Sequence, residues 1–132
     1  MEKVEFETRV AEIQEKEGIC HVKIKAGVVI ALEDTKDIDE VFKKLANNNR
    51  IVICADITQI KYVTFEARRY RSKSPMNKLI IAMALITKSH MARIIGSFII
   101  GLNKPPFQVK IFNSESAAVD WLQQFTPLKS KK

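Results

Sequence analysis

The sequence predicts an α/β domain in which an N-terminal β-hairpin precedes alternating strands and helices. Residues 4–14 and 19–25 alternate apolar with polar side chains, which is the pattern of half-buried strands. Residues 51–55 and 79–86 are continuous apolar runs, which are typical of parallel strands covered by helices. Elsewhere apolar residues recur at intervals of three and four, the spacing of amphipathic helices.

The first half of the chain supplies the hairpin and one helix. The turn at 15–18 joins the two alternating segments, and the apolar residues 28–31 indicate an extension of the second strand. Asp37 and Glu40 have the spacing of a capping box. We therefore predict a helix over 37–48, ended by three asparagines, whose apolar face contains Ile38, Val41, Phe42, Leu45 and Ala46.

The segment after the strand at 51–55 is expected to form a short helix that buries little. Thr64 is a suitable N-cap, and Pro75 prevents the helix from continuing. After the strand at 79–86, Ser89 is expected to cap a third helix. The apolar face of that helix comprises Met91, Ile94, Ile95, Phe98, Ile99 and Leu102.

The C-terminal part predicts one more strand and one more helix. The strand covers 107–112, with Phe107, Val109 and Ile111 on one side. Asn113 or Ser114 caps the last helix, whose inner face contains Ala118, Trp121, Leu122 and Phe125. The predicted order is β-β-α-β-α-β-α-β-α, with a mixed, mostly parallel sheet and covering helices.

Length and composition favour a single domain. The chain has 132 residues, of which 46% are hydrophobic and 28% charged. We expect one domain over residues 1–126 and a basic flexible tail over 127–132. No apolar run approaches the ~20 residues of a membrane span, and the N-terminus has no signal-peptide pattern. The prediction is a cytoplasmic protein without a membrane span.

Charge and cysteine content limit the kinds of partner. The net charge is +7, and much of it clusters at Lys61, Arg68, Arg69, Arg71, Lys73 and Lys78. Such a cluster forms either a solvated face or a surface for anionic partners. Cys20 and Cys54 lie within apolar segments, so we predict buried thiols rather than a disulfide or a metal site.

Several segments resemble a known superfamily. They are Asp56, Thr64–Arg68, Ala92–Gly96, Asn103–Pro105, Phe112 and Ala118–Leu122. Together with the order of elements, they make nearly the whole chain similar to STAS-like domains, the fold of bacterial anti-sigma-factor antagonists. The similarity is greatest to an uncharacterised branch of that superfamily. The resemblance implies a non-enzymatic regulator that binds a protein partner.

The phospho-acceptor of the best-known members is not matched. In those proteins an Asp-Ser-Ser-Gly motif stands at the start of the second helix. The loop between Asp56 and Thr64 contains no Ser-Gly, and Thr64 is the nearest hydroxyl to the helix start. We expect Thr64 to act as a helix cap, so the phospho-switch does not transfer. Whether Thr58 or Thr64 is phosphorylated stays open.

The candidate binding site lies where the parallel strands end. Ligands of open α/β sheets bind beyond the carboxyl ends of the strands, and helix N-termini there favour anions. The residues expected at this anion- or partner-binding edge are Asp56, Thr58, Lys61, Thr64, Arg68, Thr87, Ser89, His90 and Arg93.

Catalysis has weaker support, and we predict no catalytic residue, cofactor or metal. The sequence has no P-loop, GxGxxG, HExxH or CxxC motif. Ser89 and His90 are adjacent, which is the wrong geometry for a nucleophile and its base. An acid–base role for Asp56 and His90 is the enzymatic alternative.

Ile100 offers a different kind of contact. It is expected to lie opposite the apolar face of the third helix, where it would support a homodimer or a groove for a hydrophobic ligand. Nucleic acid is the least favoured partner, because few aromatic residues are interleaved with the basic cluster. They are Tyr62 and Tyr70, with Phe65 between them.

The leading hypothesis is therefore a regulatory or interaction domain that is not an enzyme. It would present the second helix and the preceding loop to a protein partner or a small anion. Two alternatives stay open: a domain that binds a lipid or small hydrophobe through the third helix, and weak binding of anions or nucleic acid through the basic second helix.

Overall fold

The main sheet has six strands and a mixed, mostly parallel arrangement. The computed structural model describes residues 5–88, 90 and 106–126. The strand order is β1 (Phe6–Glu7), β2 (Ala11–Lys16), β3 (Ile19–Ile24), β5 (Ile51–Asp56), β7 (Ile80–Ile86) and β8 (Gln108–Phe112). The first two pairings are antiparallel and the last three are parallel. The predicted fold class is confirmed.

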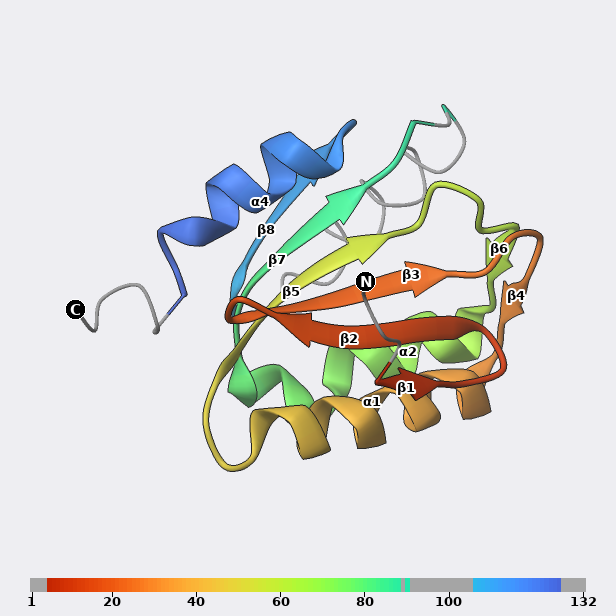
Figure 1. The fold of residues 1–132 in the computed structure, drawn as a ribbon. Helices are drawn as coiled ribbons and strands as arrows, with labels where there is room; N and C mark the ends of the chain where they lie inside the picture. Colours follow the sequence, from red (N-terminus) through yellow and green to blue (C-terminus); the bar gives the residue numbers. More distant parts are fainter. Residues whose placement is uncertain (1–4, 89, 91–105, 127–132) are drawn as a thin grey trace.

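Helices cover both faces of this sheet, as Figure 1 shows. Helices α1 (Leu32–Ala46) and α2 (Phe65–Lys73) lie on one face, and α4 (Glu115–Gln123) lies on the other. The third helix predicted after Ser89 falls outside the described residues. No helix in the described ranges is long and apolar enough to cross a membrane.

The N-terminal segment predicted as one strand over 4–14 is two strands, and that prediction was wrong. The Thr8 hydroxyl accepts hydrogen bonds from the backbone N–H groups of Val10 and Ala11 at 3.2 and 3.1 Å. This side-chain turn folds β1 back onto β2. The alternation therefore changes phase, since Val10 and Ala11 are both buried.

The hairpin that follows is confirmed. Lys16 pairs with Ile19, which leaves Glu17 and Gly18 as a two-residue turn. Both have positive φ, at 55° and 83°, the conformation of a type I′ turn. This turn fixes the register in which Ile13 faces Val22.

Helix α1 begins at Leu32, five residues before the predicted start at Asp37. Its N-cap is Ala31, whose side chain cannot accept a hydrogen bond. Only one of the two hydrogen bonds of a capping box is therefore made, and it comes from Asp34 at position N3. The Asp34 carboxylate accepts the Ala31 N–H at 2.8 Å. The predicted end is confirmed, because Asn47 adopts the left-handed conformation at the C-cap.

The apolar residues 28–31 do not extend the hairpin strand. They include β4 (Val29–Ile30), which pairs in parallel with β6 (Tyr62–Val63) in a second, two-stranded sheet. The turn before β4 passes through Gly27, whose φ of +71° is unfavourable for other residues. The predicted extension was wrong because the chain leaves the main sheet at this turn.

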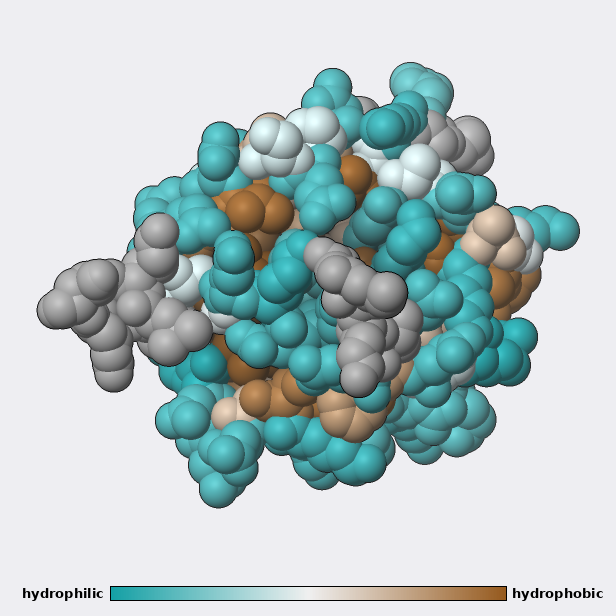
Figure 2. Space-filling model, viewed as in Figure 1, coloured by the Kyte–Doolittle hydropathy of each residue, from teal (hydrophilic) through white to brown (hydrophobic). Residues whose placement is uncertain are grey.

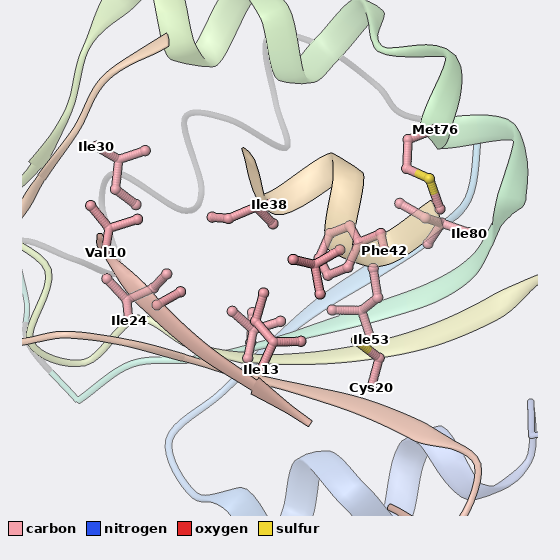
Figure 3. Close-up of a cluster of buried hydrophobic side chains, with 14 of the residues drawn as sticks. Val10, Ile13, Cys20, Ile24, Ile30, Ile38, Phe42, Ile53, Met76 and Ile80 are labelled. Carbon is pink, nitrogen blue, oxygen red and sulfur yellow. The ribbon is translucent and has the colours of Figure 1, made fainter. Parts of the chain in front are cut away.

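The larger core lies between the sheet and helices α1 and α2. It includes Val10, Ile13, Ile38, Phe42 and Ile53, of which Figure 3 shows the packing. Each fully buried aliphatic side chain of this size contributes about 1.5–3 kcal/mol to folding. The apolar face predicted for the first helix is thus the face that packs on the sheet.

The opposite face of the sheet carries a smaller core under α4. Ala82, Ala84 and Cys54 are buried there together with Ala118 and Leu122 of the helix. Small side chains on β7 allow α4 to approach the strand backbone closely. The Ser114 hydroxyl caps α4 by accepting the Ala117 N–H at 3.2 Å, as predicted.

Candidate functional site

The carboxyl end of β5 brings part of the predicted edge together. Asp56 is paired with Ile86 in the sheet, so the segment after β5 starts beside the end of β7. The Asp56 carboxylate accepts the backbone N–H of Thr58 at 2.9 Å and lies 4.0 Å from the Lys23 ammonium. Thr87 is fully buried, and its N–H donates to the Phe112 carbonyl. Asp56 therefore shapes the turn that leaves the strand.

The rest of the 57–64 loop lies against the segment that contains β4. Three backbone hydrogen bonds join the two: Gly27 N–H to Gln59, Lys61 N–H to Val28, and Thr64 N–H to Ile30. This pairing could not be predicted from the sequence, because a strand of two residues has no periodicity. Lys61 and Thr64 therefore lie beside the β4 segment, whereas Asp56 lies beside the end of β7.

Thr64 is the N-cap of α2, as predicted. Its hydroxyl accepts the Ala67 N–H at 3.1 Å, and its carbonyl accepts the Arg68 N–H at 3.0 Å. The residue is half-buried. The hydroxyl thus satisfies one of the free N–H groups of the first helical turn.

Exposed apolar side chains gather where β4, β6 and α2 meet. Val29, Tyr62 and Phe65 are 37%, 48% and 59% exposed, and they are the large hydrophobic residues recorded as exposed in the described ranges. Val29 and Tyr62 are direct partners in the small sheet, and Phe65 is the first residue of α2. We call these three residues the apolar patch. Figure 2 shows hydrophobic atoms at the right-hand edge, where Figure 1 places β4 and β6.

This patch was not predicted from the sequence. A short helix that buries little was expected here, and Ala67 is the one fully buried residue of α2. Phe65 precedes Ala67 by two positions, which places it on a different side of the helix. This spacing of two positions was the sequence signal that Phe65 and Ala67 do not share one face of the helix.

Most of the predicted basic cluster is exposed, but two arginines turn inward. Lys61, Arg69, Lys73 and Lys78 are exposed. Arg68 and Arg71 are half-buried, and the Nε atom of each is fully buried. The basic surface is therefore smaller than the sequence suggests.

Arg71 belongs to a buried hydrogen-bond network between α1 and the end of α2. Its guanidinium donates to Asp39 at 2.6 Å and to the Asn77 side-chain oxygen at 3.2 Å. The Ser74 hydroxyl donates to the second Asp39 oxygen at 2.5 Å and accepts the Met76 N–H. This network fixes α2 at its C-terminal end, where the helix itself buries little.

Among the residues that the structure describes, an apolar cavity of about 180 Å³ lies between the sheet, α1 and α2. Its walls include Ile53, Met83 and Val109 from three strands, and Arg68 and Arg71 also line it. The cavity therefore combines aliphatic walls with two guanidinium groups.

A polar groove of about 220 Å³ lies on the other face of the sheet, beside α4. The His21 Nδ1 is 3.9 Å from the Glu115 carboxylate, and Cys54 lines the floor. Burial raises the pKa of the Cys54 thiol to about 12, and the charges of Glu115 and Asp56 add to this shift. At neutral pH the thiol is protonated and a poor nucleophile.

The remaining predicted residues divide into two groups. His90 is described and exposed, whereas Ser89, Arg93 and Ile100 lie outside the described residues.

Cys20 and Cys54 are free, buried thiols as predicted. Within the described ranges, no group of three His, Cys, Asp or Glu side chains is placed to hold a metal ion.

Comparisons with solved structures place the fold. The chain is similar to a protein of the DUF3478 family with a SpoIIAA-like fold from Shewanella loihica PV-4, with TM-score 0.64 and 18% identity. That match covers 85% of this chain and 91% of the other. An anti-sigma factor antagonist from Mycobacterium paratuberculosis matches with TM-score 0.58 and 6% identity, over 86% and 92% of the two chains. These likenesses confirm the predicted STAS-like fold.

Sequence comparison gives the family. No curated protein matches the chain. The model of the family described as "Domain of unknown function (DUF7793)" matches residues 13–126. This range extends from the hairpin to the end of the last helix and covers most of the 132 residues. The chain therefore belongs to the DUF7793 family and has a SpoIIAA-like fold.

Proposed function

We propose that this chain is a non-enzymatic regulatory or interaction domain that binds a protein partner through the apolar patch and the adjoining start of α2. The observation that carries the proposal is the exposure of Val29, Tyr62 and Phe65 at one end of the molecule. Exposed aromatic residues of this kind are enriched at the centre of protein interfaces. The similarity to a protein named an anti-sigma factor antagonist supports the same class of function.

Charge around the patch suggests the character of the partner. Lys61 precedes Tyr62, and Arg69 lies one turn after Phe65; both are exposed. A partner surface with an apolar centre and acidic neighbours would complement this arrangement. We also propose that the turn of Asp56 and Thr58, at the carboxyl end of β5, is a separate contact for a partner or a small anion.

Two arguments support a role other than catalysis. The Asp56 carboxylate is engaged by the Thr58 N–H, as expected for a turn residue. The Cys54 thiol is kept protonated by burial. Binding of anions or nucleic acid through α2 stays a prediction, and Arg71 contributes less to it because Asp39 neutralises its charge.

The test is site-specific photo-crosslinking in the source cells. A photoreactive amino acid at position 62 or 65 should give a covalent adduct with one protein, identified by mass spectrometry. The same probe at Ser116, which is exposed on α4 across the sheet, serves as the control. Phe65→Ser should remove the adduct formed from position 62. Equal adducts from all three positions, or none from 62 and 65, would refute the proposal.

A second candidate function is the binding of a small hydrophobic molecule. The sequence predicted such binding at the third helix, which lies outside the described residues, and the cavity is a different location for it. The apolar cavity between α2 and the sheet favours it. Binding sites for small molecules are concave and mostly apolar, with few polar groups. Its test is a titration with an uncharged aliphatic alcohol, followed through the methyl resonances of Met83 and Ile53, which line the cavity.

A further inference from the structure

Three exposed side chains of α2 form one row along the helix. Phe65, Arg69 and Lys73 are spaced four residues apart, so they lie one above another on the helix surface. All three are exposed. None of them lines the apolar cavity, whereas Ala67 and Arg71 of the same helix do. The row, which we call the α2 row, therefore starts at the apolar patch and follows the solvent side of α2 for about 12 Å.

The cations in and beside this row have no ionic partner within the protein. Lys61, Arg69 and Lys73 make no ion pair with any residue that the structure describes. By contrast, other lysines lie within 4.0 Å of a carboxylate, namely Lys23, Lys25, Lys36 and Lys43. The charges next to the apolar patch are thus available to a ligand, because no carboxylate of the described chain compensates them.

The net charge of this surface defines what a ligand must carry. Lys61, Arg69 and Lys73 contribute three positive charges, and the exposed Glu66 contributes one negative charge, so the sum is +2. A ligand that compensates this charge carries at least two anionic groups. Because the cations of the α2 row begin one turn after Phe65, the ligand also needs an apolar group at one end.

Glu66 favours a peptide over other anionic ligands. It is exposed in the first turn of α2, between Phe65 and the cations of the row. A nucleic acid or an anionic membrane presents closely spaced negative charges, and Glu66 would repel them beside the aromatic contact. A peptide can place carboxylates opposite Arg69 and Lys73 and an uncharged residue opposite Glu66.

We infer that the protein partner contributes an acidic peptide segment that lies along α2. An apolar side chain of the segment packs against Phe65 and Tyr62, and two carboxylates lie against Arg69 and Lys73. In an extended segment, about four residues span the length of the row. This inference rests on the proposed function, binding of a protein partner at the apolar patch, and adds the chemistry and the placement of the bound segment.

The first experiment selects ligands from a displayed library of random peptides. Their length of about twelve residues is three times what is needed to span the row. Peptides that bind the full-length wild type should be enriched in aspartate and glutamate next to an aromatic or large aliphatic residue. The double variant Arg69→Glu, Lys73→Glu should instead select peptides enriched in lysine and arginine.

The second experiment measures the affinity of one selected peptide by fluorescence polarisation. Arg69→Glu should weaken binding about ten-fold, because it removes an attraction and adds a repulsion. Glu66→Gln should strengthen binding about two-fold, since it removes the one acid of the surface. Lys110→Glu makes the same change in net charge at an exposed position of β8, and its affinity should stay within about two-fold of the wild type. Circular dichroism confirms that each variant is folded.

The outcomes separate this inference from the proposed function. Selected peptides without acidic enrichment, or equal losses of affinity in Arg69→Glu and Lys110→Glu, overturn the inference, while the crosslinked adduct from positions 62 and 65 leaves the proposed function standing. Vesicles containing phosphatidylserine and a single-stranded DNA are tested alongside. If either binds through Arg69 and no peptide is selected, the inference is also overturned. Absence of the adduct together with absence of peptide binding overturns both claims.

Discussion

The Arg71 guanidinium of α2 donates a 2.6 Å hydrogen bond to Asp39 of α1, across 32 positions of sequence. Asp39 is 4% exposed and also accepts the Ser74 hydroxyl. The contact joins two helices that cover the same face of the sheet. It explains how α2 is held in place although Ala67 is its one fully buried residue.

Asp39→Ala should lower the free energy of unfolding by about 3 kcal/mol, because removing one member of a buried ion pair leaves the other charge uncompensated. Urea denaturation measures this loss. Asp37→Ala is the matched control, since Asp37 is exposed on the same helix, and its effect should stay within about 0.5 kcal/mol. Equal losses in the two variants would contradict a special role of the Asp39–Arg71 contact.

Asp34 should make stability depend on acid pH. Its hydrogen bond to Arg9 holds the pKa of the carboxyl group below its usual range. A depressed pKa in the folded state contributes stability that is complete above the unfolded pKa of about 4 and is lost as the pH falls through the folded value.

Asp34→Asn should therefore lower the free energy of unfolding by about 1 kcal/mol at pH 7, a modest value because Arg9 is largely exposed. The difference from the wild type should shrink as the pH falls below about 4. Urea denaturation at several pH values measures it. Glu33→Gln, at an exposed position of the same helical turn, should have little effect at any pH. A difference independent of pH would exclude ionisation as the cause.

The two cysteines should resist modification in the native protein. Burial raises the pKa of Cys20 and of Cys54 to about 12, so the reactive thiolate is scarce at pH 8. A chromogenic disulfide reagent should detect both thiols only after denaturation. Ser116→Cys, which places a thiol on the exposed side of α4, should add one that reacts at once. Rapid reaction of the native wild type would contradict the burial.

Ala84→Leu should destabilise the protein by about 1–3 kcal/mol through overpacking. Ala84 is 0% exposed, and it shares the smaller core with Ala118 of α4, which is also 0% exposed. Thermal denaturation measures the expected fall in Tm. Ala117→Leu adds the same side chain at an exposed position of α4 and should be neutral. A Tm unchanged by Ala84→Leu would show that α4 packs loosely.

The long, regular elements could be predicted from the sequence because their signals are local. The apolar runs identified β5 and β7, and the hydroxyls of Thr64 and Ser114 identified the starts of α2 and α4. The start of α1 could not be predicted in this way. The Ala31 side chain cannot cap, and Asp34 acts from inside the helix through the backbone of Ala31.

The features that define the candidate sites depend on tertiary structure. The spacing of Phe65 and Ala67 places the two residues on different sides of α2, but which side is buried depends on how the helix packs on the sheet. The pairing of Val29 with Tyr62 joins residues 33 positions apart in two-residue strands. From the sequence alone, Asp39 and Arg71 look like solvent-exposed charges on two separate helices. They form an ion pair because the two helices pack side by side.

Helix α2 presents Phe65 to the outside and Arg68 to the cavity, and these residues are three positions apart. An occupant of the cavity and a partner at the apolar patch would thus act on the same short helix, α2. By thermodynamic linkage, if the cavity occupant changes the affinity for the partner by some factor, the partner changes the affinity for the occupant by the same factor. Because the Arg71–Asp39 network holds the C-terminal end of α2, such coupling would act on the first turn of the helix, which contains Phe65.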